Sequence, residues 1–166
     1  MAQFLLVSTL VTIAGLIATI VLGFLSTPVH AAQHILLALA TVIIGLFSQS
    51  MTMFFFIGTG KQLKDKTAGS GEEAEVKRAT RELTMKVSPA ATYAMAIIMV
   101  TFIMGGGVKT GKTPLWLHDM LSFASIVLFA RAYWIEINAM MANAELMTRF
   151  MRDTEPRPSE GPNPAP

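Results

Sequence analysis

The sequence contains no cysteine, and it contains no aspartate, glutamate, lysine or arginine before Lys61. The absence of cysteine excludes a disulfide framework and a thiolate metal site, so a bound metal would need histidine, methionine or oxygen ligands. Charged residues make up only 14% of the 166 residues and hydrophobic ones 52%, which is too apolar for a soluble domain of this size. We therefore expect an integral membrane protein.

The charges that are present are unevenly distributed along the chain. Twelve of them lie between Lys61 and Lys86, and most of the others follow Asp119. They form no basic surface of the kind that binds nucleic acid. The expected surroundings are the lipid bilayer and other membrane subunits, or further copies of the same chain.

Four apolar segments are long enough to cross about 30 Å of hydrocarbon as helices at about 1.5 Å per residue. They are roughly residues 3–25, 29–57, 89–108 and 115–140. Three begin at a hydroxyl residue followed by proline, a pair that suits the first positions of a helix; the pairs are Thr27-Pro28, Ser88-Pro89 and Thr113-Pro114. The sequence thus predicts an all-α polytopic protein whose residues 1–150 form an antiparallel four-transmembrane-helix bundle.

The polar segment 61–86 predicts a short cytoplasmic amphipathic helix between spans two and three, opened by a capping box at Ser70 and Glu73. This segment carries seven Lys and Arg residues and the C-terminal tail three, against two (Lys109 and Lys112) in the turn between spans three and four. The positive-inside rule then puts both termini in the cytoplasm, and we expect the bacterial inner membrane. The proline-rich tail, residues 151–166, is expected to be disordered.

Small and polar residues form stripes at helical spacing along three of the spans. Ser8, Thr12 and Thr19 mark the first; Thr41, Gly45, Ser48 and Thr52 mark the second; Ser88, Thr92, Ala96 and Met99 mark the third. Because lipid favours neither small nor polar side chains, we expect all three stripes to face the interior of the bundle.

The three histidines of the chain are predicted to lie at one depth near the outer face. His30 and His34 follow Pro28 by two and six residues, and His118 follows Pro114 by four. Both spans run inward from the same face, so on helical rise His118 falls within about 3 Å in depth of each of the other two imidazoles. The spacing of His30 and His34 puts them on one face of their helix.

This arrangement fits two chemistries. In the first, His34 and His118 are the axial ligands of a haem b, and His30, Lys109 or Lys112 meets its propionates. In the second, His30, His34 and His118 hold a single transition-metal ion. The alternative without a cofactor is that the imidazoles cap helices or meet lipid headgroups.

A second polar group is expected in the inner leaflet. Arg131 lies about 20 Å below His118 along the fourth span, and Gln49 and Tyr93 reach a similar depth on the second and third. An arginine inside the bilayer needs polar partners or a route to water, so these three side chains are candidates for a quinone headgroup site.

These features favour a small b-type cytochrome, or a haem-bearing subunit of an electron-transfer complex linked to quinone, over a stand-alone enzyme. Two other functions remain open at this point. One is a non-catalytic metal-binding or assembly protein that uses the outer histidines, and the other is a structural accessory subunit without a cofactor.

Overall fold

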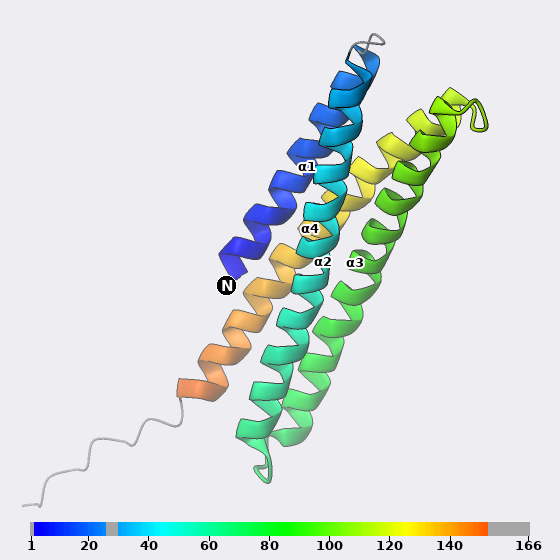
Figure 1. The fold of residues 1–166 in the computed structure, drawn as a ribbon. Helices are drawn as coiled ribbons and strands as arrows, with labels where there is room; N and C mark the ends of the chain where they lie inside the picture. Colours follow the sequence, from blue (N-terminus) through cyan, green and yellow to red (C-terminus); the bar gives the residue numbers. More distant parts are fainter. Residues whose placement is uncertain (1, 26–29, 153–166) are drawn as a thin grey trace, which may run out of the picture.

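The computed structural model describes residues 2–25 and 30–152, which form four antiparallel helices (Figure 1). They are α1 (Ala2–Phe24), α2 (Ala31–Thr67), α3 (Glu73–Lys109) and α4 (Leu115–Arg152). Each is long and apolar enough to cross a membrane, which confirms the all-α four-helix bundle. The expected helix start at Thr27-Pro28 and the expected disorder of residues 153–166 lie outside the described residues.

The helices pack as two hairpins, α1 with α2 and α3 with α4. Helix α2 also contacts α3, α1 contacts α4, and α2 and α4 touch across the diagonal of the bundle. Within the described residues α1 and α3 make no such contact, so α2 and α4 are the central pair. Helices α2 and α4 run in the same direction, since each is the second helix of its hairpin (Figure 1).

The segment 61–86, expected as a short helix of its own, is instead divided between the end of α2 and the start of α3. Helix α2 continues to Thr67, and after a turn α3 begins at Glu73 and runs without a break through Pro89. The Ser88-Pro89 pair therefore does not start a helix. Pro89 is exposed, so its ring lies on the outside of α3 and costs the backbone bond to Met85 without disturbing the core.

Helices α2, α3 and α4 extend beyond the start of α1 as a three-helix extension with its own small core. Leu63, Val76 and Phe150 are buried there, one from each helix. Its surface carries charges that include the ion pairs Glu82–Lys86 (2.8 Å) and Glu75–Arg149 (2.8 Å). Both pairs are exposed and contribute little to stability.

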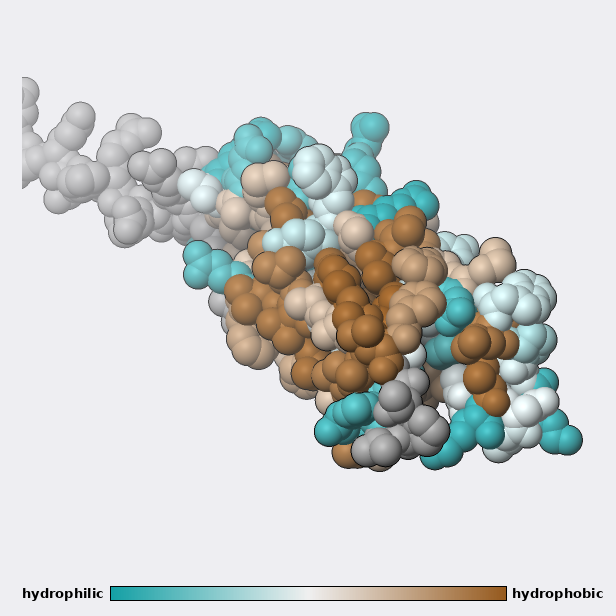
Figure 2. Space-filling view, turned by 90° about the horizontal axis from the view of Figure 1, so that it is seen from above, coloured by the Kyte–Doolittle hydropathy of each residue, from teal (hydrophilic) through white to brown (hydrophobic). Residues whose placement is uncertain are grey.

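Hydrophobic side chains cover the middle of the visible face, and hydrophilic ones gather toward its borders (Figure 2). Large hydrophobic side chains are more than half exposed on all four helices, among them Phe4, Leu36, Phe47, Ile103 and Trp134. Such a surface is what a bilayer requires and what water would disfavour.

The buried face of each helix is only partly the one expected. The small and polar stripe of α2 is buried, with Thr41, Gly45, Ser48 and Thr52 inside, and Thr12 of α1 is buried as well. The stripe of α3 faces outward, because Thr92, Ala96 and Met99 are exposed. Helix α3 instead buries another series of residues: Val87, Ala91, Ala94, Ile98 and Thr101.

Candidate functional site

The two hairpins bury corresponding positions along their lengths. A constant shift in residue number carries the buried residues of α1 onto those of α3: Leu5 onto Val87, Thr9 onto Ala91, Thr12 onto Ala94 and Leu16 onto Ile98. A second constant shift carries buried residues of α2 onto those of α4: Thr41 onto Ser125, Gly45 onto Phe129, Ser48 onto Ala132, Thr52 onto Glu136 and Phe56 onto Met140. The bundle is therefore pseudo-symmetric, with one hairpin equivalent to the other.

This pseudo-symmetry relates His34 to His118. Each is the fourth residue of its helix, in α2 and α4, and these two central helices run parallel. Each therefore stands at the same distance from the first residue of its helix, the relation on which the predicted common depth rests. Both imidazoles are partly buried.

The imidazole ring of His34 packs on α1 against Gly23, where a larger side chain would crowd the ring. Its Nδ1 lies 3.0 Å from the carbonyl oxygen of Thr19. A carbonyl can only accept, so Nδ1 carries the proton and the lone pair is on Nε2. A Cβ added to Gly23 would come 3.1 Å from His34 Cε1, so the glycine makes room for the ring.

His118 packs on α3 in the equivalent way. A Cβ added to Gly105 would come 2.9 Å from His118 Cε1, and the ring faces the backbone carbonyl of Thr101. Each histidine thus lies against a threonine and a glycine four residues apart on the preceding helix. The Nδ1 of His118 is buried and has no hydrogen-bond partner within residues 2–25 and 30–152.

His30 is in a different position from the other two. It is the exposed residue that precedes α2. In the described ranges no group of three or more His, Asp or Glu side chains is placed to hold a metal ion.

The structure divides the expected inner site into two places. Arg131 and Tyr93 are both exposed, and together with Lys86 they line a groove of about 250 Å³ between α3 and α4. Gln49 is instead fully buried and lies in the interior against α1. The groove therefore has two of the three residues expected, and a lysine that sequence reasoning did not include.

Sequence reasoning missed the polar cluster that surrounds Gln49. Glu136 is only 1% exposed, and Thr9 donates a hydrogen bond of 3.1 Å to its Oε2. The amide of Gln49 lies 3.4 Å from the same threonine hydroxyl. The available signal was a carboxylate deep inside the fourth apolar segment, spaced from Phe129 and Ala132 so as to share their buried face.

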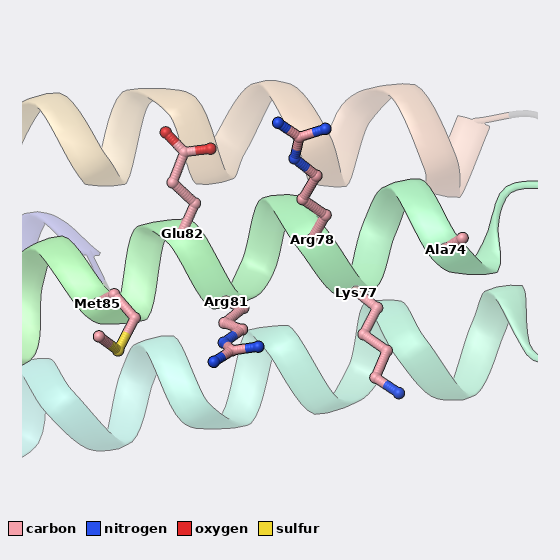
Figure 3. Close-up of a pocket in the computed structure, with 6 residues that line it drawn as sticks. All are labelled: Ala74, Lys77, Arg78, Arg81, Glu82 and Met85. Carbon is pink, nitrogen blue, oxygen red and sulfur yellow. The ribbon is translucent and has the colours of Figure 1, made fainter.

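Another groove, of about 500 Å³, runs along the polar half of α3. Figure 3 shows Arg78 and Glu82 pointing to one side of the helix and Lys77 and Arg81 to the other. The side chains diverge, so they do not converge on a common ligand. They form the basic surface of the three-helix extension.

Comparison of the chain with protein-family models, with curated proteins and with solved structures gives no match in any of the three.

Proposed function

We propose that the protein is a small membrane cytochrome in which His34 and His118 hold a b-type haem near the outer face. The observation that carries the proposal is the pseudo-symmetric placement of two imidazoles, each the fourth residue of one of two parallel helices. Bis-histidine haem sites in helical bundles need one imidazole from each of two helices. When bound, the haem supplies a reversible one-electron couple.

The residues of the chain prepare this pair for ligation. Thr19 holds the proton on Nδ1 of His34, which leaves Nε2 free to bind iron. The ring of His118 packs on α3 in the equivalent orientation, so its Nε2 is the corresponding nitrogen for iron. The small side chains of Gly23 and Gly105 allow both rings to stand close to their supporting helices. Lys109 and Lys112, near the same end, are cations available to the haem propionates.

The groove lined by Tyr93, Arg131 and Lys86 is the candidate quinone site of this proposal. It is mostly apolar, with two cations and a phenol that can meet polar headgroup oxygens. It lies about 20 Å from the histidines along α4. Electrons would then pass between the two levels of the bundle, as expected of a subunit in a larger redox complex.

Replacing either His34 or His118 with alanine is expected to remove bound haem from the purified protein. Each variant leaves one axial ligand, so haem content and the sharp reduced-minus-oxidised bands should be lost. The His30→Ala variant is the control and should keep both, because His30 stands outside the pair. Equal haem content in all three variants would refute the proposed ligands.

The colour and metal content of the wild-type protein distinguish the two alternative functions. A colourless wild type with stoichiometric copper or zinc would favour a metal-binding protein, and a colourless wild type with neither metal would favour a structural subunit.

The proposed orientation places the basic three-helix extension and both termini in the cytoplasm of a bacterial cell. Since the chain contains no cysteine, single cysteines can report it directly. Ser70→Cys is expected to resist a membrane-impermeant maleimide in whole cells, whereas Thr110→Cys should react. Both residues are exposed, so accessibility in detergent serves as the matched control. The reverse labelling pattern would contradict the orientation.

A further inference from the structure

Glu136 is a buried carboxylate at the centre of the bundle that the haem proposal does not use. It is 1% exposed, and its Oε2 accepts a hydrogen bond from Thr9 on α1, whose hydroxyl in turn accepts one from Gln49 on α2. Neither of the two ion pairs found among the described residues includes it. A buried carboxylate with no cation beside it is strongly destabilising while ionised.

The helices around Glu136 offer no counter-charge in the described ranges. Helix α1 has no ionisable side chain, and the charged residue of α2 nearest in sequence to Gln49 is the exposed Lys61. On α3, Lys86 is exposed and paired with Glu82. On α4 itself, Arg131 is exposed and Tyr133, one turn away, is only partly buried.

Three oxygen atoms of this cluster are buried without a hydrogen-bond partner in the described part of the chain. They are Oε1 of Glu136, Oε1 of Gln49 and Oγ1 of Thr52. While Glu136 is ionised, its Oε1 and the Oε1 of Gln49 can only accept hydrogen bonds, so both oxygens lack a donor. A proton on Glu136 would remove the charge and turn one of those acceptors into a donor.

A chain of hydroxyl groups leads from Glu136 toward the outside of α1. Thr9 Oγ1 lies 3.1 Å from Glu136 Oε2 and 2.8 Å from Ser48 Oγ, and Ser48 Oγ lies 2.8 Å from Ser8 Oγ. Ser8 is only partly buried. Each hydroxyl can accept one proton and donate another, so the row can pass protons along without being changed.

We propose that Glu136 is a proton-binding site of the bundle, loaded through the hydroxyl groups of Ser8, Ser48 and Thr9. In the binding step one proton forms an O–H bond with the carboxylate, whose charge falls from minus one to zero. Each hydroxyl gives one proton to its neighbour and receives one, so the row ends as it began. This site stands apart from the haem proposal, and either can fail without the other.

Infrared spectroscopy of the full-length protein in liposomes tests this site. At neutral pH the wild type is expected to show the C=O band of a protonated carboxylic acid, which shifts in D₂O and declines as the pH is raised. Glu136→Gln should lose this band. Glu145→Gln, the same change at an exposed position of α4, should keep it. Absence of the band in the wild type at neutral pH, or its persistence in Glu136→Gln, would overturn the proposal.

The hydroxyl row is tested by the rate at which this band shifts after transfer to D₂O. Thr9→Val keeps the shape of the side chain and removes its hydroxyl. It should slow the exchange about tenfold, the factor that corresponds to one lost hydrogen bond. Thr12→Val is the control, because the Thr12 hydroxyl donates to the Ser8 carbonyl and lies outside the row. Equal rates in both variants would refute the row.

A metal cation in place of the proton would be recognised in a second measurement. Thermal stability of the wild type is expected to be the same in sodium chloride and in choline chloride. A stabilisation that requires sodium and disappears in Glu136→Gln would show that the oxygen cluster binds the metal ion, and would overturn the assignment to a proton.

Discussion

The Phe129→Ala variant is expected to lower the free energy of unfolding of the bundle by about 3–5 kcal/mol. Phe129 is fully buried on α4, where its ring reaches across to α2: a Cβ added to Gly45 would come 3.2 Å from Phe129 Cζ. Truncation would leave a cavity between the two central helices, next to Leu16 and Ile98. The helices cannot close this space without moving the other buried contacts.

The measurement is reversible unfolding in mixed detergent micelles, followed by loss of helical structure. Phe54→Ala is the matched control, because Phe54 is 65% exposed on the outer surface of α2. Its effect should stay within about 0.5 kcal/mol. Equal destabilisation by the two substitutions would mean that Phe129 is not at the centre of the bundle.

The Gly105→Ala variant is expected to weaken haem binding about 10–100-fold, the range seen when the support of a metal ligand is altered. The new Cβ would come 2.9 Å from Cε1 of His118, so the imidazole must move. The ring is the outer end of a side chain and can shift without unfolding α3. The loss should therefore appear in haem affinity and in the optical bands, while the helical content is unchanged.

The neighbouring glycine supplies the control for this substitution. A Cβ added to Gly106 would meet nothing within 4 Å. Gly106→Ala should therefore keep the affinity of the wild type. If both alanine variants bind haem equally well, the position of the His118 ring does not depend on Gly105, and the proposed support is wrong.

The number of helices could be predicted because it depends on length and hydropathy. The predicted depth of His34 and His118 follows from their positions relative to the helix starts, because a helix rises by a fixed amount per residue. The buried face of α2 was also predictable, because four small or polar residues recur there at helical spacing.

The buried face of α3 was not predictable in the same way. In an apolar helix surrounded by lipid, the face that packs on other helices can be marked by small side chains as well as by polar ones. Ala91 and Ala94 of α3 face the neighbouring helices, whereas Thr92 does not. The hydroxyl of Thr92 is satisfied within its own helix by the Ser88 carbonyl, at 2.8 Å, so it needs no partner in the bundle.

Two further differences have local causes. Pro89 suggested a helix start, but α3 is held on both sides of it by the buried residues Leu83, Val87 and Ala91, and packing outweighs one missing hydrogen bond. Gln49 was placed by its depth beside Arg131, whereas its direction around α2 points it to Thr9 and Glu136. The expected depth of a side chain follows from counting residues along the helix. The direction in which the side chain points depends on which face of the helix the neighbouring helices cover.

The pseudo-symmetry of the two hairpins is difficult to recognise in the sequence, because the equivalent residues differ in type. Thr9 corresponds to Ala91 and Thr52 to Glu136, so the shared property is burial and not identity. Identical residues occur at equivalent positions where the two histidines are supported. These are the Thr–Gly pairs Thr19 with Gly23 and Thr101 with Gly105.

The central claim, that His34 and His118 converge on one haem, is tested most directly by the near-infrared magnetic circular dichroism of the oxidised wild-type protein. The position of the charge-transfer band identifies the pair of axial ligands in a low-spin ferric haem. The account predicts the band of two neutral imidazoles. Protein that contains no haem when made in haem-replete cells, or a band that belongs to another ligand pair, would contradict it.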